Sequence, residues 1–334
     1  MKICSCCILP ESFPGISFDE QGVCNHCRSY KPETVGHEAK KQYEDKFVAL
    51  AAEHRNPKGY DVLMAYSGGK DSTYTLDLFV NRYHLTVLAL TFDNSFISER
   101  SFVNMNSVTE ALGVDHLILR PNPGTLKKIF QVAAQRELYS PKAMERASTI
   151  CTSCIGMVKG VMLRTALEKG IPFVGFGWSP GQAPLQASVM RTNPGLTKMT
   201  QKAIQEPLCS VVSDGHVLSP YFVSEEQFSA PETFPWNVHP LAFLDYDEEK
   251  IIARNRELGW EKPLDTDANS TNCLLNAYAN EVHVKRYGFH PYVWEIANMV
   301  RIGVMTREKG LEKFEQGENP ALVTYAKERL EDHR

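Results

Sequence analysis

The pattern of apolar and polar positions predicts an α/β fold. Short apolar runs typical of buried strands occur at residues 61–66, 85–92, 117–119, 172–178 and 238–244. Stretches with apolar residues at helical spacing follow the first two runs, at residues 75–80 and 98–112. Because strand and helix alternate in units of about thirty residues, we expect a parallel sheet with helices on both faces and a ligand site at the carboxyl ends of its strands.

The regions on either side of this domain have different patterns. Residues 37–56 predict a connecting helix, and residues 273–287, 291–302, 306–316 and 320–332 predict a run of helices. Residues 179–235 are rich in Pro, Ser, Gly and Gln, and we expect an insertion or mobile lid there. The chain therefore divides into a small module at 1–30, a linker helix at 31–57, the α/β domain at 58–250 and a helical C-terminal region at 251–334.

Composition narrows the class of protein. The chain has 334 residues, of which 43% are hydrophobic and 23% are charged, which excludes a disordered or fibrous chain. No apolar stretch approaches the roughly 20 residues of a membrane-spanning helix and no apolar signal core follows Met1, so we expect a cytoplasmic protein without a membrane partner. The net charge of −4 gives no general electrostatic attraction to nucleic acid, so RNA is a less favoured ligand. The sequence does not determine the oligomeric state, and a homodimer is possible.

Two Cys-x-x-Cys pairs stand near the N-terminus, formed by Cys4, Cys7, Cys24 and Cys27. A reducing cytoplasm disfavours disulfides, whereas four thiolates suit tetrahedral zinc. A module of about thirty residues buries too little surface to fold alone, so metal binding would stabilise it. We expect a zinc ribbon at residues 1–30; reactive or incidental thiols are the alternative, and Cys6 beside Cys7 leaves open which sulfur binds.

The sequence Ser67-Gly68-Gly69-Lys70-Asp71-Ser72 lies between the first predicted strand and its helix. Adjacent glycines let backbone N–H groups approach an anion closely, and the following helix adds its positive end. The spacing matches neither the Walker phosphate loop nor the three-glycine dinucleotide motif. The pattern predicts a phosphate-binding loop, with a surface turn carrying incidental glycines as the alternative.

This loop resembles the PP-loop of the ATP pyrophosphatase superfamily, whose members have an adenine nucleotide alpha hydrolase fold and attach AMP to a substrate oxygen. The resemblance implies that ATP and Mg²⁺ bind in a catalytic domain spanning residues 58–250. It assigns pyrophosphate binding to Ser67, Gly68, Gly69 and Ser72, and charge compensation to Lys70. Asp71 would orient Mg²⁺, act as a base or cap the helix, and Asp93 would line the nucleotide pocket or serve as a turn residue.

Residues 2–27 resemble the start of N-acetyl sugar amidotransferases, in the paired cysteines and in the intervening Pro10, Pro14 and Gly22. In that group a zinc module precedes the same kind of loop, and ammonia from a partner glutaminase replaces an oxygen on an activated amide. The similarity extends over residues 1–120. It implies nitrogen transfer to a sugar as one possible activity.

The chain departs from that pattern at Cys151 and Cys154, which begin a predicted helix, and at Cys273, which begins another. This set resembles the ligands of iron–sulfur-dependent PP-loop tRNA thiolases. In those enzymes three thiolates hold a 4Fe-4S cluster and leave one iron open, which implies delivery of hydrosulfide to the adenylated carbon. A second zinc, a redox pair and buried packing cysteines are the alternatives, and Cys209 is unassigned.

Together these features predict an ATP-dependent sulfurtransferase that releases AMP and pyrophosphate. It would adenylate a carbonyl oxygen of a small-molecule acceptor and replace that oxygen with sulfur from sulfide or a sulfur donor protein. The alternatives are an amidotransferase acting on an N-acetyl sugar with ammonia, a tRNA thiolase, and a non-catalytic RNA-binding module. Residues 175–182 are expected to face the cleft or form a tight turn, and His239 to recognise an acidic substrate or lie on a solvated face.

Overall fold

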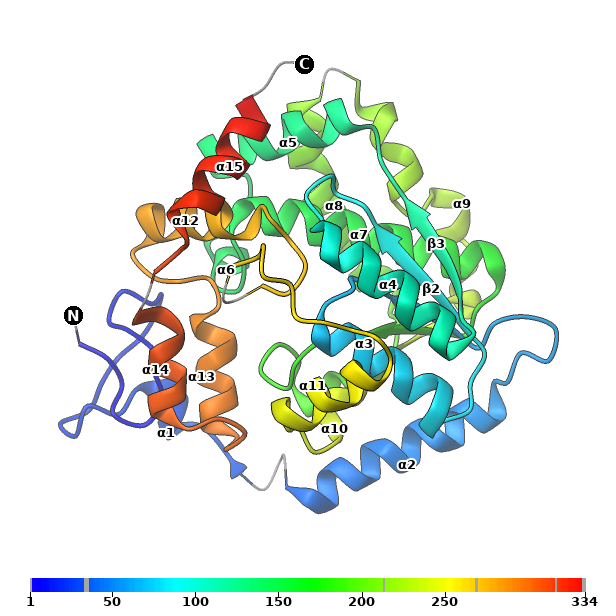
Figure 1. The fold of residues 1–334 in the computed structure, drawn as a ribbon, viewed down its shortest axis with the longest axis horizontal. Helices are drawn as coiled ribbons and strands as arrows, with labels where there is room; N and C mark the ends of the chain where they lie inside the picture. Colours follow the sequence, from blue (N-terminus) through cyan, green and yellow to red (C-terminus); the bar gives the residue numbers. More distant parts are fainter. Residues whose placement is uncertain (1, 33–35, 213, 268–269, 316, 332–334) are drawn as a thin grey trace.

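A computed structural model describes residues 2–32, 36–212, 214–267, 270–315 and 317–331. Its centre is a six-stranded sheet with the strand order β3-β2-β1-β4-β6-β5 (Figure 1). The strands are β1 (Val62–Ala65), β2 (Val87–Phe92), β3 (Asp115–Leu119), β4 (Phe173–Phe176), β5 (Val189–Arg191) and β6 (Trp236–Val238). All neighbouring pairs are parallel except β5 with β6, and this mostly parallel sheet confirms the predicted α/β class.

Helices cover both faces of the sheet. One face carries α2 (His37–Glu53), α3 (Lys70–Asp77), α4 (Glu99–Leu112), α10 (Pro240–Phe243) and α11 (Glu248–Glu257), and the other carries α5 (Pro123–Gln135), α7 (Thr149–Lys169) and α8 (Pro194–Val211). Neighbouring strand residues point to opposite faces, so Met64 belongs to the first core with Phe79, while Leu63 belongs to the second with Phe130. Two separate apolar cores therefore hold the sheet between its helices.

The chain changes faces between β1 and β4, which are neighbours in the sheet. β1 leads into α3 on one face, whereas α7, which precedes β4, covers the other face. The segments that leave the carboxyl ends of two such strands diverge, and ligands of open α/β sheets bind in the crevice between them. The segments after β1 and β4 are therefore the first place to look for a functional site.

Two expectations for residues 179–244 are wrong. The run predicted as a strand at 238–244 is divided, because β6 ends at Val238 and α10 begins at Pro240, which cannot donate to a sheet but fits the first turn of a helix. The segment expected to be an irregular lid contains α8, a helix of 18 residues that starts at Pro194 and packs on α7. Cys209 lies in this helix.

Helix α7 corrects the expectation that no segment is long and apolar enough to span a membrane. It has 21 residues, and a window within it reaches a mean hydropathy of 1.3. In the structure it packs against β1, β4, α5, α8 and α12 (Asn276–Tyr287). A Cβ at Gly160 would lie 2.3 Å from the Tyr221 carbonyl oxygen, which shows how closely this helix is packed. These contacts within the protein account for its apolar composition.

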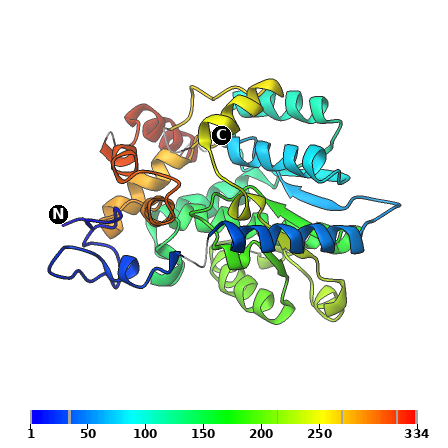
Figure 2. The same cartoon turned by 90° about the horizontal axis from the view of Figure 1, so that it is seen from below.

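The N-terminal module and the C-terminal helices pack together at one end of the molecule (Figure 2). The module contains α1 (Asn25–Arg28) and two antiparallel bridges, Ile3 with Pro10 and Phe18 with Cys24. Its apolar residues pack against α13 (Val293–Arg301) and α14 (Arg307–Glu315). The chain ends with α15 (Pro320–Glu331), which packs on α12.

The helices predicted for the C-terminal region correspond to α12, α13, α14 and α15, although α12 begins at Asn276 rather than at Cys273. Residues 316 and 332, where two of the predicted helices end, lie outside the described residues. The boundary expected at residue 250 falls within α11, which packs on α3.

Candidate functional site

Residues 67–69 form a tight turn between β1 and α3, and residues 70–72 form the first turn of α3. Gly68 has a φ of +73°, which favours glycine, and a Cβ there would lie 2.7 Å from Met105 Cε. Ser72 Oγ lies 3.0 Å from Ser67 Oγ and donates to the Gly69 carbonyl oxygen at 3.0 Å. α3 begins at Lys70, so its first N–H groups and its positive end face the turn. This is the geometry that the phosphate-loop prediction requires.

The Lys70 side chain is held by acidic and phenolic groups beside this turn. Its Nζ lies 2.9 Å from both carboxylate oxygens of Asp71, 2.6 Å from Tyr246 Oη and 3.5 Å from Glu248 Oε1. Burial lowers the pKa of Lys70, but Asp71, Tyr246 and Glu248 together outweigh burial and raise that pKa above its ordinary value. Lys70 therefore carries a positive charge at neutral pH.

Asp71 does not cap α3, which was one of the three roles left open for it. The N-cap of α3 is Gly69, and no side chain caps the helix. The Asp71 carboxylate instead accepts hydrogen bonds from Lys70 and, at 3.0 Å, from the hydroxyl of Tyr246. Binding of Mg²⁺ and action as a base stay predictions. No sequence signal marked Tyr246, which reaches the loop from the segment after α10.

The segment after β4 lies between the phosphate loop and α13. A Cβ on Gly177 would lie 2.5 Å from Ser72 Cα, so the two backbones are in close contact. On the other side, Asn298 Nδ2 of α13 donates to the Gly181 carbonyl at 3.0 Å, and Ser179 Oγ donates to Glu295 Oε1 at 2.6 Å. Residues 177–181 therefore lie between the phosphate loop and α13. The Gln182 N–H donates to the Ser179 carbonyl at 3.0 Å, so the segment forms the tight turn that was the alternative, and its contact with a ligand stays a prediction.

Glu295 is a titratable group of this cleft that the sequence did not indicate. Burial raises the pKa of its carboxyl to about 7, and the negative charge of Asp71 acts in the same direction. The hydrogen bond from Ser179 and the charge of Lys70 oppose the shift. Glu295 therefore exchanges a proton near neutral pH, within electrostatic range of the phosphate loop.

Asp93 and Asn94 follow β2 at the same edge of the sheet. Asp93 is 2% exposed, accepts from the Ser95 N–H at 2.9 Å and pairs with Arg120 Nε at 2.6 Å. It is thus a turn residue with a counter-ion, and its contact with nucleotide stays a prediction. Asn94 points elsewhere, toward the cysteines of the second predicted metal site.

Cys154 and Cys273 meet around the side chain of Asn94. Asn94 Nδ2 lies 3.7 Å from each of the two sulfurs, and the Phe96 N–H holds Asn94 Oδ1 at 2.9 Å, which fixes the orientation of the amide. Cys151 lies one helical turn before Cys154 in α7. Burial raises the pKa of all three thiols, that of Cys151 to about 12. Without a metal these thiols stay protonated at neutral pH, and a bound metal would displace their protons.

A short segment connects these cysteines to the phosphate loop. The backbone N–H of Lys70 donates to Thr271 Oγ1 at 3.3 Å, and Cys273 follows two residues later. The segment is held in place because Ser98 N donates to the Asn272 carbonyl at 2.9 Å and Leu274 N donates to the Phe96 carbonyl at 2.8 Å. Residues 271–273 therefore run from the phosphate loop to Cys273, and a shared site of the three cysteines and the loop stays a prediction.

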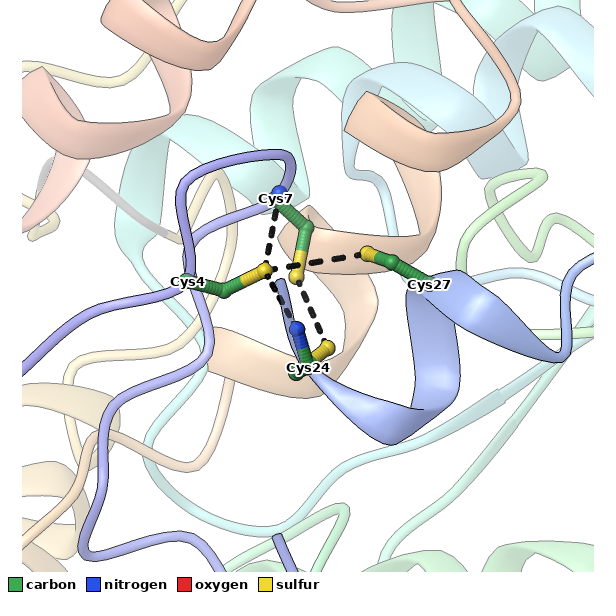
Figure 3. A group of neighbouring side chains, drawn as sticks. All are labelled: Cys4, Cys7, Cys24 and Cys27. Atoms are coloured by element: carbon green, nitrogen blue, oxygen red, sulfur yellow. Dashed lines mark hydrogen bonds between the residues drawn. The ribbon is translucent and has the colours of Figure 1, made fainter. Parts of the chain in front are cut away.

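The N-terminal cysteines form a compact four-sulfur cluster. Figure 3 shows the sulfurs of Cys4, Cys7, Cys24 and Cys27 pointing toward one another, and all four lie within 4.8 Å of each other. The Cys4–Cys27 and Cys7–Cys24 sulfur pairs are separated by 3.9 and 3.8 Å. Tetrahedral zinc with bonds of about 2.3 Å holds its sulfurs about 3.8 Å apart, so these residues fit the predicted zinc ion.

Donors around this cluster complete the fit to a metal. The backbone N–H groups of Cys7 and Cys24 point at Cys4 Sγ, at 3.5 and 3.2 Å. Arg301 of α13 donates to Cys7 Sγ at 3.3 Å. A hydrogen bond from Cys27 lowers the pKa of Cys7 to about 5, although burial opposes this shift. Such donors stabilise thiolate charge. Cys6 is exposed and does not belong to the four-sulfur cluster. Of the two neighbouring cysteines, Cys7 is therefore the one whose sulfur faces the cluster.

Comparisons with known proteins place few limits on function. No protein-family model matches this sequence. An uncharacterized protein of Methanocaldococcus jannaschii is 24% identical over 325 residues, which cover 96% of this chain and 95% of that protein.

Two solved structures are similar in part. The U34-tRNA thiolase NcsA from Methanococcus maripaludis with its 4Fe-4S cluster aligns with 100% of this chain and 90% of its own, at 14% identity and a TM-score of 0.37. NMN synthetase from Francisella tularensis aligns with 65% of this chain and 93% of its own, at 14% identity and a TM-score of 0.30. Scores of this size do not establish a shared fold, so the site is interpreted from its own residues.

Proposed function

We propose that this protein is an ATP-dependent transferase of the PP-loop type, which replaces a carbonyl oxygen of a small molecule with sulfur and releases AMP and pyrophosphate. The observation that carries the proposal is the segment 271–273. Thr271 contacts the phosphate loop, and Cys273 meets Cys154 around Asn94. ATP at the loop and a sulfur species held near these thiols would then lie side by side, which is the arrangement that sulfur transfer to an adenylated carbon needs.

The reaction would consist of two bond exchanges. First, the carbonyl oxygen of the acceptor bonds to the α-phosphorus of ATP while the bond to pyrophosphate breaks, and an amide acceptor loses its N–H proton. Hydrosulfide then adds to the carbon, AMP leaves with the former carbonyl oxygen, and the proton on sulfur moves to the nitrogen. The acceptor thereby becomes a thioamide, and every proton and electron pair is accounted for.

The residues of the chain would serve this reaction through charge and position. The N–H groups at the start of α3 and the positive charge of Lys70 would stabilise the phosphate charges in the crevice. Ser67 and Ser72 add hydroxyl donors at the same turn. Glu295, with its pKa of about 7, suits the acceptance of the amide proton, because a general base works best when its pKa lies near the working pH.

The second cysteine set fits an iron–sulfur cluster better than a single zinc ion. Among the described residues, only the N-terminal cysteines form a group of three or more His, Cys, Asp or Glu side chains that are close enough to share one metal ion. Cys151, Cys154 and Cys273 do not form such a group. A four-iron cluster binds each thiolate through a different iron, so it accepts sulfurs that stand farther apart. Cys151, Cys154 and Cys273 would hold it, and Asn94 would donate to the ligand sulfurs. When bound, the cluster would supply an iron without a protein ligand, suited to holding hydrosulfide.

The proposal also specifies partners and surroundings. The acceptor is a small molecule, and the sulfur comes from sulfide or from a sulfur donor protein. All nine cysteines are free of disulfides, which suits a protein that works in a reducing cytoplasm. Neither nucleic acid nor membrane is part of the proposal.

Metal analysis of protein purified without oxygen tests this function. We expect zinc and iron in a ratio of one to four, with the visible absorption of an iron–sulfur cluster. Cys151→Ala should lose iron and sulfur transfer but keep zinc and ATP binding, whereas the control Cys209→Ala, in α8, should keep all four. An active protein without iron, or a Cys151→Ala variant with full iron content, would overturn the proposal.

A second candidate is nitrogen transfer to an N-acetyl sugar. The four-sulfur cluster favours it, because the resemblance to the sugar amidotransferases rests on the same N-terminal cysteines. Release of AMP that depends on ammonia and is unchanged in Cys151→Ala and Cys273→Ala would support this candidate over sulfur transfer.

A further inference from the structure

Trp260 is a buried residue, distant in the sequence, that donates a hydrogen bond to the backbone of the phosphate loop. Its side chain is 1% exposed, and its Nε1 lies 2.9 Å from the Gly68 carbonyl oxygen. An indole N–H can only donate, so the carbonyl is the acceptor and the direction of this contact is unambiguous. Trp260 belongs to the apolar core that also contains Leu76 of α3 and Met105 of α4, and it therefore contacts the loop from the interior of the protein.

The end of α11 places Trp260 at this position. α11 packs on α3 (Figure 1), and the chain leaves it through Gly259, whose φ of +84° favours glycine. The Gly259 N–H donates to the Arg256 carbonyl and the Trp260 N–H donates to the Asn255 carbonyl, both at 3.0 Å. These two bonds form a Schellman motif, which ends the helix and turns the next residue in a defined direction. The direction of Trp260 is thus set by local backbone structure.

Side-chain amides hold the backbone on both sides of Trp260. Asn104 of α4 accepts from the Glu261 N–H at 3.0 Å and donates to the Glu261 carbonyl at 2.7 Å. Asn255, which is fully buried, donates through Nδ2 to the Lys70 carbonyl at 2.8 Å. Trp260 is therefore fixed relative to α4 on one side and to the start of α3 on the other.

The hydrogen bond from Trp260 determines the orientation of the Gly68–Gly69 peptide. In a trans peptide the C=O and the N–H point in opposite directions, so the Gly69 N–H points away from the indole. It points toward Ser67 Oγ at 3.4 Å, and Ser67 Oγ lies 3.0 Å from Ser72 Oγ. A peptide between two glycines has little steric preference between its two orientations, because neither residue has a Cβ. The indole donor selects the orientation that turns the Gly69 N–H toward the two serine hydroxyls.

We propose that Trp260 is a positioning residue for phosphate binding, because its hydrogen bond holds the Gly68–Gly69 peptide with the Gly69 N–H directed at a bound phosphate. Without the indole N–H, the buried Gly68 carbonyl loses this donor, and the peptide turns toward another donor or water. The Gly69 N–H is then withdrawn from the phosphate. The phosphate in this inference rests on the proposed ATP site, and the inference is the same for sulfur transfer and nitrogen transfer.

Nuclear magnetic resonance can observe this one peptide, because Gly68 and Gly69 are the only adjacent glycines in the sequence. Protein is prepared with glycine labelled by ¹³C at the carbonyl and by ¹⁵N, with unlabelled serine in the medium. A spectrum that correlates each amide with the preceding carbonyl then contains a single signal. In Trp260→Phe we expect the Gly68 carbonyl carbon to move upfield, as for a carbonyl that loses a hydrogen bond. Mg²⁺ and pyrophosphate should move the Gly69 amide proton of the unmodified protein downfield.

Calorimetry with pyrophosphate and Mg²⁺ measures the consequence for binding. Trp260→Phe should weaken pyrophosphate binding by about tenfold or more, as expected for one lost charge-assisted hydrogen bond. Phe47→Leu is the matched control, because Phe47 is fully buried in the same apolar core and its listed ring partners, which include Phe79 and Phe173, lie outside the loop. The control should lower the melting temperature but bind pyrophosphate as the unmodified protein does.

A second variant covers the case in which Trp260→Phe does not fold. Asn104→Ala removes both hydrogen bonds that hold Glu261, and it leaves the indole in the chain. It should move the same Gly68 carbonyl signal upfield and weaken pyrophosphate binding.

Two results would overturn the inference. One is a Gly68 carbonyl resonance that Trp260→Phe leaves unchanged, and the other is an equal loss of pyrophosphate affinity in Trp260→Phe and Phe47→Leu. A Gly69 amide of the unmodified protein that responds neither to pyrophosphate nor to an ATP analogue would overturn the ATP site itself. Absence of iron from the protein would overturn sulfur transfer alone and would leave the role of Trp260 intact.

Discussion

A Gly177→Ala substitution tests whether the segment after β4 positions the phosphate loop. The added Cβ would lie 2.5 Å from Ser72 Cα and 2.6 Å from Ser72 N. Carbon atoms in contact stay about 3.5–4.0 Å apart, so one of the two backbones must move by about 1 Å. The displacement would misalign N–H groups that donate to a bound phosphate, and a hydrogen bond to a charged group is worth about 1.5–3 kcal/mol. We therefore expect a loss of about 10- to 100-fold in affinity for a non-hydrolysable ATP analogue, measured by calorimetry.

Gly175→Ala is the matched control, because Gly175 lies in β4 two positions before Gly177. Its Cβ would lie 2.4 Å from Phe79 Cε2, within the apolar core rather than against the loop. We expect it to destabilise the fold by about 1–3 kcal/mol while the folded protein binds the analogue within about twofold of the unmodified affinity. The reasoning is refuted when Gly177→Ala binds the analogue normally, or when both variants lose affinity to the same extent.

Three other substitutions test separate parts of the structure. Cys24→Ser should abolish zinc binding and lower the melting temperature, because the N-terminal module depends on its metal; unchanged zinc in elemental analysis would contradict the four-cysteine site. Arg254→Met should destabilise the fold by about 2 kcal/mol in denaturant titration, because the Asp77 carboxylate, 8% exposed, loses a partner that binds both of its oxygens. A change in unfolding free energy within experimental error would show that water replaces Arg254 as the partner of Asp77. Glu295→Gln tests how stability depends on pH. Folding raises the pKa of Glu295 from 4.5 to about 7, so the folded protein holds this proton to a higher pH than the unfolded chain does. The resulting stabilisation is complete below about pH 4.5 and is lost as the pH rises through about 7. The variant should therefore lose less stability than the unmodified protein between about pH 5 and about pH 8 in thermal unfolding. Equal slopes would refute the shift, which arises from burial and the charge of Asp71 and is opposed by Ser179 and Lys70.

The parts of the site that the sequence predicted are those encoded by neighbouring residues. The phosphate loop is one continuous hexapeptide that follows β1 and ends in the first turn of α3, so its spacing alone indicates its geometry. The paired cysteines are similarly local, since each Cys-x-x-Cys turn brings two sulfurs to one side. Strands β1, β2 and β4 are buried apolar runs, which are the strongest strand signal in a parallel sheet.

The remaining site residues come from distant segments and have no local pattern. Tyr246 reaches Lys70 across 176 positions, and Glu295 reaches Ser179 across 116. Only the fold brings such pairs together, so neither residue could be selected from its surroundings in the sequence. The errors at α8 and α10 have other causes. The prolines of residues 179–235 were taken as evidence against regular structure, although Pro194 fits the start of α8. The apolar run at 238–244 was taken as one strand, although Pro240 fits the start of a helix.

Helix α13 connects the N-terminal cysteine cluster with the segment beside the phosphate loop. Arg301, its last residue, is anchored on a sulfur of the N-terminal cluster, and Glu295, less than two turns earlier, faces the reaction crevice. A zinc ion bound by the four N-terminal cysteines would therefore help to position Glu295, a side chain that it does not contact. Depletion of zinc from a cell would then impair this protein even when its nucleotide supply and its iron are intact. Activity measured on protein purified without zinc would likewise be too low.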